Sequence, residues 1–184
     1  MKKRLRPVFV VMLAAALVAW WFRGPVQAWA YGVDAGRATG TPAPELPVLK
    51  TVSGPRVNLA DLRGRVVLLH FWTFGCSNCK NMIPHYVAWD SAYRARGLSL
   101  VGVHTPELSF ERDPAALKRF VDANHIVWPV VIDPDERAWN AFDVHAWPTS
   151  ILIDKGGIVR ATFVGDNRSR DIEAALQKLL LAGS

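Results

Sequence analysis

Two cysteines, Cys76 and Cys79, lie between two strong secondary-structure signals, and together these limit the folds that the chain can adopt. The apolar run 66–69 (Val-Val-Leu-Leu) precedes the pair and is typical of a buried strand. The segment 81–96 follows it, with large apolar side chains at steps of three and four residues, which indicates a helix. These side chains are Met82, Tyr86, Trp89 and Tyr93. The sequence therefore predicts a strand that turns into a helix, with Cys76 in the turn and Cys79 one helical turn further on.

This placement predicts dithiol–disulfide exchange. Unpaired N–H groups and the macrodipole at a helix start stabilise an anion, so the thiol of Cys76 is expected to ionise readily. Cys79, three residues along the helix, is close enough to form a disulfide with it. One activated thiol and one resolving thiol are what exchange requires, and no cofactor beyond the Cys76–Cys79 disulfide is expected.

The spacing of the two cysteines also fits two other kinds of site. The pair could be half of a zinc site, but such a site needs four ligands and the chain has only 2 cysteines. It could also be a passive structural disulfide, although so short a loop constrains the unfolded chain very little. Redox exchange is favoured because the motif lies between a buried strand and a helix.

The first thirty residues have the pattern of an export segment. Residues 1–6 include four basic side chains, residues 8–22 carry no charge, and Ala-Trp-Ala at 28–30 offers a small-x-small cleavage site. The apolar run is shorter than the ~20 residues of a typical bilayer span. Arg23 directly after it is untypical of a cleaved signal. We therefore expect residues 1–30 to be a signal peptide or an N-terminal membrane anchor.

Either form of this segment would place residues 31–184 in the periplasm or on the outer face of the cytoplasmic membrane. The charge supports the same division of the chain. Of the 22 basic residues five precede residue 31, which leaves 17 against 16 acidic residues in the remainder. A nearly neutral domain lacks the basic face that nucleic-acid binding requires.

The rest of the chain is predicted to form a linker over residues 31–45 and one domain over residues 46–184. A small hairpin is expected from two arms, 46–49 and 56–59, around the turn 53–55. Further strands are predicted at 98–103, 130–132, 149–153 and 158–164, and helices at 113–124, from 133 onward and around 172–180. This order, β-α-β-α-β-α-β-β-α, predicts an α/β fold around a mixed sheet.

Residues 42–184 resemble the thioredoxin superfamily, specifically its exported TlpA/DipZ-like branch. Trp72 lies four residues before Cys76, Lys80 directly follows Cys79, and Pro84 lies five residues after Cys79, as in the active-site helix of thioredoxins. The segments 102–107 (Gly-Val-His-Thr-Pro-Glu) and 110–111 (Phe-Glu) are similar to the DipZ-like group, as is the sequence Phe-Trp-Thr-x-x-Cys-x-Asn-Cys around the site. Trp-Pro-Thr at 147–149 looks like the family's cis-proline loop, and Gly165 matches its glycine after the last strand.

The resemblance implies a thioredoxin-like fold, with a central mixed sheet flanked by helices and an N-terminal β-hairpin extension. It also implies a thiol–disulfide oxidoreductase acting on disulfide-containing protein substrates. Pro148 would belong to its active site, and Trp72, Trp147 and Thr149 would contact the substrate. The multi-span electron-delivering segment of DipZ-like proteins is not in this chain, so the electron donor is expected to be a separate membrane protein of the CcdA/DsbD type. We expect a monomer.

The chain departs from the family at positions that bear on proton transfer. His70 stands where thioredoxins have a buried aspartate, and Met82 stands where TlpA-type reductases often have a glutamate. A neutral imidazole could accept the proton of Cys79, so His70 is predicted to assist the resolving step. His104 and Glu107 follow a predicted strand at the edge where α/β proteins build sites, and form a possible proton relay.

Two rival functions remain. The sequence Thr-Phe-Gly-Cys at 73–76 imitates the Thr-x-x-Cys of a peroxiredoxin, but Leu69 stands where that family has a proline, and this reading does not explain Cys79. A copper- or metal-handling module could use both cysteines with His104 or His145. The redox reading predicts no bound metal.

Overall fold

The computed structural model describes residues 39–47 and 49–182. The predicted export segment 1–30 and most of the predicted linker lie outside these residues. Within them, a single six-stranded mixed sheet has the order β1-β4-β3-β2-β5-β6. Its strands are β1 (Lys50–Ser53), β2 (Val66–Trp72), β3 (Leu98–His104), β4 (Val130–Ile132), β5 (Thr149–Ile153) and β6 (Val159–Val164). The predicted α/β fold around a mixed sheet is confirmed.

Strand β2 lies in the middle of the sheet and carries the chain into the cysteine turn. It pairs in parallel with β3 and antiparallel with β5. All seven of its residues are buried, because helices or loops cover both faces of the sheet. A strand in this position needs apolar residues in succession, which is what the run 66–69 supplies.

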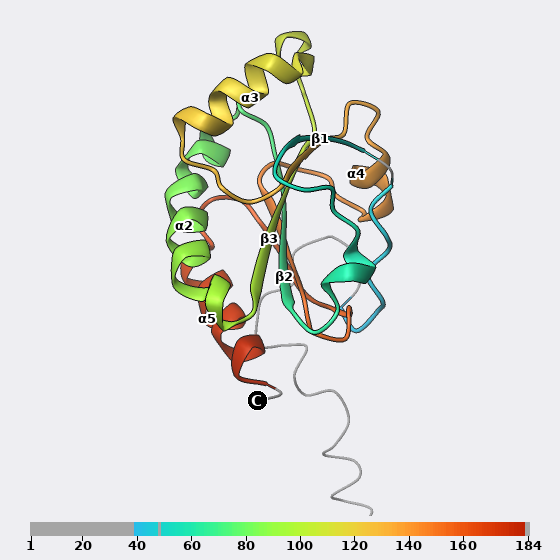
Figure 1. Ribbon diagram of the computed structural model, residues 1–184, viewed down its shortest axis with the longest axis vertical. Helices are drawn as coiled ribbons and strands as arrows, with labels where there is room; N and C mark the ends of the chain where they lie inside the picture. The colour runs from blue at the N-terminus through green and yellow to red at the C-terminus, as the bar shows by residue number, and fades with distance from the viewer. Residues whose placement is uncertain (1–38, 48, 183–184) are drawn as a thin grey trace, which may run out of the picture. The chain divides into compact units, whose positions relative to one another are not determined.

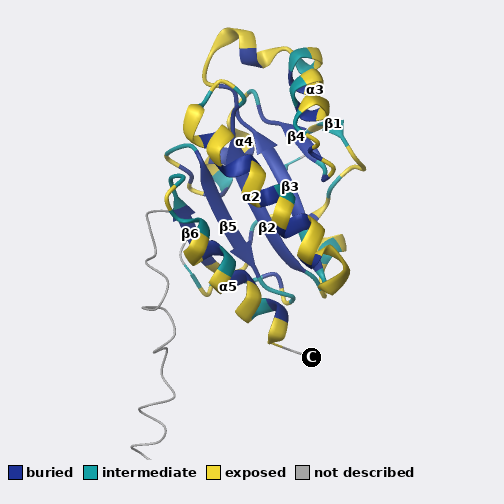
Figure 2. Ribbon diagram, turned by 90° about the vertical axis from the view of Figure 1, so that its left-hand side faces the viewer, coloured by how far each residue is buried: buried dark blue, intermediate teal, exposed yellow. Residues whose placement is uncertain are grey.

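Alternate residues of β2 face two separate cores. Val66, Leu68 and Trp72 pack with α2 (Ser77–Tyr93), α3 (Pro114–Ala123) and α5 (Ser169–Leu181). Leu69 and Phe71 pack on the other face with α4 (Arg137–Ala141) and the 3₁₀ turn η1 (Leu59–Leu62). Figure 1 shows α2 and α5 on one side of the sheet and α4 on the other, and Figure 2 shows the buried strands between exposed helix surfaces.

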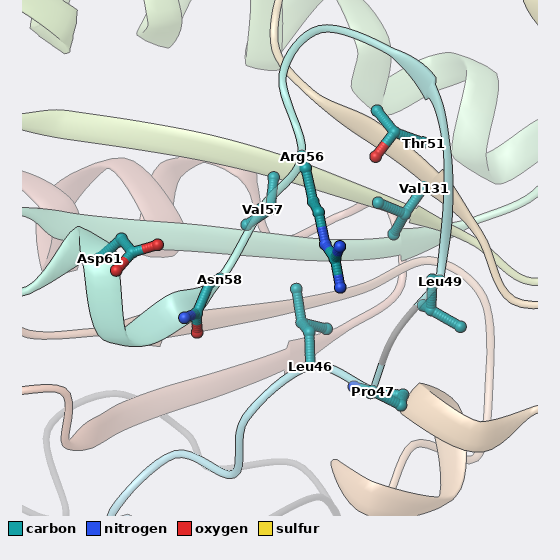
Figure 3. Close-up of a pocket in the computed structure, with 9 residues that line it drawn as sticks. All are labelled: Leu46, Pro47, Leu49, Thr51, Arg56, Val57, Asn58, Asp61 and Val131. Carbon is teal, nitrogen blue, oxygen red and sulfur yellow. The ribbon is translucent and has the colours of Figure 1, made fainter.

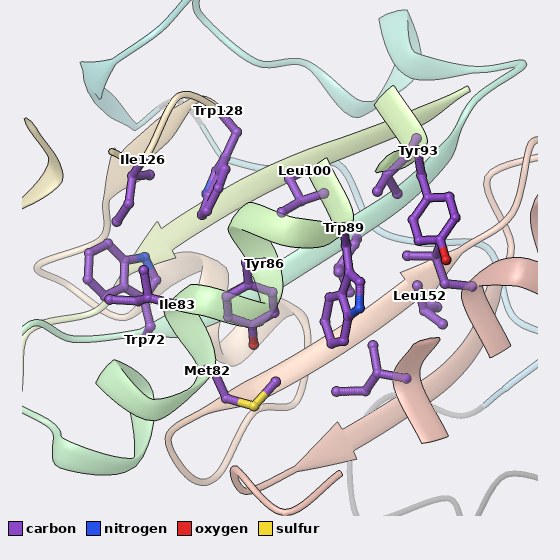
Figure 4. Close-up of a cluster of buried hydrophobic side chains, with 14 of the residues drawn as sticks. Trp72, Met82, Ile83, Tyr86, Trp89, Tyr93, Leu100, Ile126, Trp128 and Leu152 are labelled. Carbon is purple, nitrogen blue, oxygen red and sulfur yellow. The ribbon is translucent and has the colours of Figure 1, made fainter. Parts of the chain in front are cut away.

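The predicted stripe on the cysteine helix is confirmed. Met82, Tyr86, Trp89 and Tyr93 are all buried against the sheet. Figure 4 shows these side chains on α2 above the strands, with Trp128 beside them. Removing large apolar and aromatic surface from water is the main force that holds this helix on the sheet.

The predicted helix start at Asp113 is confirmed, whereas the helix predicted from residue 133 begins later, at Arg137, after the N-cap residue Glu136. The carboxylate of Asp113 accepts the N–H of Ala115 and caps α3. The buried carboxylate of Asp133 accepts the N–H groups of Arg137, Ala138 and Trp139, so α4 begins four residues after it. In the described part of the chain no helix is long and apolar enough to cross a membrane.

The predicted N-terminal hairpin over 46–59 is wrong. β1 pairs antiparallel with β4 instead of with residues 56–59. The chain turns at Gly54, whose φ of 75° brings it so close to Pro129 that a side chain there would meet the proline backbone at 2.9 Å. Asn58 then caps η1 by accepting the N–H of Ala60, so the second predicted arm ends in a helical turn rather than a strand.

The described end of the predicted linker belongs to the domain. Gly40 and Ala43 donate their N–H groups to the carbonyls of Val159 and Gly157 at 2.8 and 2.9 Å. Pro42 forms an isolated antiparallel bridge with Ile158. Residues 40–43 therefore contact the β6 end of the sheet, although they precede the predicted domain boundary at residue 46.

Candidate active site

The two cysteines lie where β2 passes into α2, as predicted. Cys76 is the N-cap residue of α2, and its Sγ accepts the N–H of Cys79 at 3.3 Å. Cys76 is half-buried, whereas Cys79 is only 1% exposed, and both are free thiols. An anion on Cys76 would meet the unpaired N–H groups and positive dipole end of the helix. Cys76 is therefore the accessible thiol of the pair and Cys79 the protected one.

Burial raises the pKa of the Cys79 thiol, and its hydrogen bond with Cys76 raises that pKa further. A backbone hydrogen bond from Thr73 acts in the opposite direction, while the charge of Glu111 adds a smaller increase. The thiol of Cys79 therefore stays protonated at neutral pH unless a base accepts its proton. This suits a resolving thiol that reacts only after Cys76.

The turn 73–75 is held by a carboxylate that sequence reasoning did not select. Glu111, in the 3₁₀ turn η3 (Ser109–Arg112), is buried, and its Oε1 accepts the N–H of Gly75 at 2.7 Å. Its Oε2 accepts the N–H groups of Glu107 and Leu108 at 2.8 and 2.7 Å. Glu111 thus ties the residue before Cys76 to the segment after β3.

The carboxylate of Glu111 stays ionised. Its burial by itself would raise its pKa, but hydrogen bonds from the Thr73 hydroxyl and the three backbone N–H groups outweigh this, so the pKa lies below its usual value. An ionised carboxylate only accepts hydrogen bonds, so the Thr73 hydroxyl donates to Glu111. Thr73 Oγ1 lies 3.2 Å from Nε2 of His104, and must then accept the N–H of that ring nitrogen.

Of the predicted proton relay, the structure brings His104 to the site but not the side chain of Glu107. His104 is fully buried and its ring stacks on Phe74. Burial lowers its pKa to about 4 although the charge of Glu111 raises it in part. Glu107 is exposed and takes part through its backbone N–H. An acid shortly after β3 was the right signal, but spacing alone did not distinguish Glu107 from Glu111.

His70 lies beneath the site on β2, on the same face as the cysteine helix. Its Nε2 accepts the indole N–H of Trp128 at 2.9 Å, and its ring stacks on Tyr86 at 4.3 Å. Burial lowers the pKa of His70 to about 3. An imidazole with its acceptor nitrogen occupied and its charged form disfavoured is a weak proton acceptor. Its predicted role in the resolving step therefore rests on the sequence alone.

The predicted proline loop lies at the same edge of the sheet. The Trp147–Pro148 bond is cis, and Pro148 directly precedes β5, whose Thr149 pairs with Phe71 of β2. Trp147 is half-buried and packs against Trp139 at 4.4 Å between ring centroids. Thr149 is buried, and its hydroxyl donates to the carbonyl of Ala146.

Two of the predicted substrate contacts are covered in this state of the protein. Trp72 is 2% exposed and Thr149 is 1% exposed, so neither presents its side chain at the surface. The ring of Trp72 packs against His104 and Phe120 instead. Trp147 is the one of the three whose side chain is only partly covered.

The surface has a pocket away from the cysteines. It has a volume of about 460 Å³ and is shown in Figure 3. Residues on both sides of the turn at Gly54 line it, together with Val131 of β4; they are Leu46, Pro47, Leu49, Thr51, Arg56, Val57, Asn58 and Asp61. None of the predicted site residues contributes to it. Among the described residues, no cluster of three or more His, Cys, Asp or Glu side chains has the arrangement of a metal site.

The chain is similar to several known proteins over this domain. It is 32% identical over 144 residues to the thiol-disulfide oxidoreductase ResA of Geobacillus kaustophilus, covering 77% of this chain and 78% of that protein. It is 36% identical over 132 residues to protein DipZ of Mycobacterium bovis, covering 72% of this chain. The matched region spans only 19% of DipZ, so that protein is much longer than its shared domain.

Solved structures agree with these relatives. A thiol:disulfide interchange protein of the thioredoxin family from Chlorobium tepidum has 28% sequence identity and a TM-score of 0.66, covering 78% of this chain and 98% of that one. The structure of an oxidised thioredoxin-like protein has 27% identity and a TM-score of 0.69, covering 76% and 95%. The fold is therefore thioredoxin-like, as the resemblance implied.

The model of the AhpC/TSA family matches residues 39–162, which include β1 to β5, both cysteines, Glu111 and the proline loop. Together with the relatives named as thiol-disulfide oxidoreductases, this agrees with the dithiol geometry of the site. The chain belongs to the AhpC/TSA family and is a thioredoxin-like member related to the thiol-disulfide oxidoreductases.

Proposed function

We propose that this protein is an exported thiol–disulfide oxidoreductase that exchanges disulfides with protein substrates through Cys76 and Cys79. The observation that carries the proposal is the asymmetry of the pair: an accessible Cys76 at the start of α2 and a buried Cys79 one turn on. An attacking thiol must reach a partner molecule, whereas a resolving thiol needs only to reach Cys76.

The reaction has two exchange steps. The thiolate of Cys76 attacks a substrate disulfide, forming a mixed disulfide and releasing one substrate thiolate. Cys79 loses its proton and attacks Sγ of Cys76, which forms the Cys76–Cys79 disulfide and releases the second substrate thiolate. Two electrons pass from the pair to the substrate, and the released thiolates take up protons.

The proline loop is proposed to hold the substrate chain beside Cys76. Pro148 directly precedes β5, which pairs with the strand that leads to the cysteines, and the partly exposed ring of Trp147 comes before Pro148. Trp72 and Thr149 would contact substrate only if binding uncovered them. Substrate recognition is therefore assigned first to Trp147 and Pro148.

The export pattern in residues 1–30 supports a location in the periplasm or on the outer face of the cytoplasmic membrane. An enzyme there must be reduced again after each turnover. A separate membrane protein of the CcdA/DsbD type is proposed as the electron donor. We propose that the enzyme acts as a monomer.

The test is to trap the intermediate. Reduced Cys79→Ser protein mixed with a disulfide-bonded model substrate such as insulin is expected to accumulate a mixed disulfide through Cys76. Cys76→Ser is the matched control and is expected to trap none. If the two variants trap equally, or if neither does, the proposal fails.

The same protein separates the rival functions. A peroxidase would oxidise Cys76 with hydrogen peroxide much faster than with a disulfide substrate, and Cys79→Ser would not trap a protein partner. A metal-handling module would bind Cu(I) or Zn²⁺ stoichiometrically in its reduced form, which titration with each metal detects. The exchange proposal expects neither result.

A further inference from the structure

We propose that the fixed negative charge of Glu111 disfavours the thiolate form of the cysteine pair and so makes the pair a better electron donor. This inference rests on the proposed function, because it concerns the direction in which the same pair moves electrons. Among the described residues, Glu111 has a buried carboxylate that lies against the cysteine turn.

The contact between Glu111 and the turn is close. A Cβ atom added to Gly75 would lie 2.2 Å from Oε1 of Glu111, so only glycine leaves room for this approach. Gly75 immediately precedes Cys76, and its N–H donates to the same oxygen at 2.7 Å. The turn therefore brings its backbone to the carboxylate at the position next to the nucleophile.

The charge of Glu111 is held in place but not neutralised. Its partners are backbone N–H groups and the Thr73 hydroxyl, all of them uncharged. In the part of the chain that the structure describes, no Lys or Arg side chain forms an ion pair with it. A fixed charge in a site largely removed from water acts on its neighbours more strongly than an exposed charge does.

Other titratable groups surround the pair. Burial lowers the pKa values of His104 and His70, so both rings are neutral above pH 6. Burial also raises the pKa of Tyr86, which stays neutral below pH 9. Lys80 follows Cys79 on α2 with an exposed side chain. Between pH 6 and pH 9 Glu111 is therefore a fixed buried charge beside the pair. The thiols are the groups whose ionisation this charge influences.

Electrostatics link this charge to the redox equilibrium. Reduction of the disulfide consumes two electrons and yields thiols or thiolates, so any group that stabilises thiolate favours the reduced pair. A fixed negative charge does the opposite, and the pair gives its two electrons to a substrate disulfide more readily. The effect is small at low pH, where both thiols are protonated, and grows as pH rises and thiolate forms.

The experiment equilibrates the protein with glutathione redox buffers between pH 6 and 9. Glu111→Gln removes the charge while keeping the side-chain size, and Asp135→Asn removes an exposed charge as the matched control. At pH 9 the variant Glu111→Gln is expected to shift the equilibrium at least threefold toward the dithiol, about 14 mV, with convergence on wild type toward pH 6. Glu111→Asp, which keeps the charge, is expected to remain closer to wild type than Glu111→Gln, and Asp135→Asn to match wild type.

A shift of equal size at every pH would mean that Glu111 acts only by holding the turn, and would overturn the inference. So would no shift, or a shift toward the disulfide. If Glu111→Gln does not fold, Thr73→Val removes one donor from the carboxylate and is expected to favour the disulfide at pH 9; an unchanged or opposite equilibrium counts against the inference. A wild-type pair that forms no disulfide with glutathione would refute the proposed function instead.

Discussion

Trp128 donates its indole N–H to Nε2 of His70 across 2.9 Å, and this bond fixes the state of the histidine. Since Nε2 accepts, the proton of the neutral ring lies on Nδ1, for which the described residues offer no hydrogen-bond partner. His70 is thus a neutral ring in an aromatic cluster formed by Trp72, Tyr86 and Trp128. The cluster joins β2, α2 and the segment before β4.

This state predicts that His70 makes the fold sensitive to acid. Its pKa is about 3 in the folded protein against 6.5 for a free side chain, so the unfolded chain binds the proton first as pH falls. The contribution of the neutral His70 ring to the free energy of unfolding is therefore present above about pH 6.5 and is lost as the pH falls below it. The loss attributable to His70 is about 2 kcal/mol between pH 8 and pH 5. Urea unfolding of wild type and His70→Asn at both pH values checks this, because the difference between the two proteins should change by that amount.

The indole hydrogen bond is expected to contribute measurably to stability. Trp128→Phe leaves Nε2 of His70 buried without a donor and is expected to cost about 1–3 kcal/mol beyond the smaller ring's lost contacts. Trp72→Phe is the matched comparison, since the N–H of that buried tryptophan has no partner among the described residues. Chemical denaturation should find Trp128→Phe the less stable variant. Equal losses would show that the bond adds nothing.

The exposure of the cysteines predicts the order in which they react. Brief alkylation of the reduced protein at mildly acidic pH is expected to label Cys76 at least roughly tenfold faster than Cys79, because Cys79 is buried and its pKa is raised. Peptide mass spectrometry of the labelled protein gives the two rates. Preferential labelling of Cys79 would reverse the roles assigned to the pair.

The prediction that His70 takes the proton of Cys79 has its own test. If it does, resolution of a mixed disulfide slows in His70→Asn near neutral pH and recovers at high pH, where Cys79 ionises unaided. His70→Asp is the comparison variant. Superimposable pH profiles would leave His70 as a packing residue, which is the outcome that its occupied Nε2 and lowered pKa favour.

The close approach of Gly75 to Glu111 predicts a strong effect of one methyl group. Gly75→Ala would place a carbon 2.2 Å from Oε1, so the carboxylate or the turn must move. We expect a loss of about 1–3 kcal/mol in stability and slower exchange. Gly156→Ala is the control, because its nearest contact beyond its chain neighbours is at 3.3 Å. Thermal unfolding and insulin reduction measure the two effects, and similar values for both variants would contradict the role given to this contact.

The local chemistry and most of the helices and strands follow from residue patterns that can be recognised without the structure. An apolar run followed by a stripe at helical spacing required a strand and a helix with the cysteines between them, and Asp113 with Pro114 marked the start of α3. These signals are local: the hydrophobic period, the capping residue and the turn residue lie within a few positions of the structure that they specify.

Which distant residues meet at the cysteine pair depends instead on the topology of the sheet. Glu111 lies 35 positions after Cys76 and reaches the turn because β2 and β3 run in parallel and end at the same edge of the sheet. Nothing in the spacing distinguished it from Glu107, since the choice depends on how η3 folds back onto Gly75. The predicted hairpin was wrong for the same reason. β1 pairs with β4, far along the chain, because strand pairing depends on tertiary contacts and not only on residues that are close in sequence.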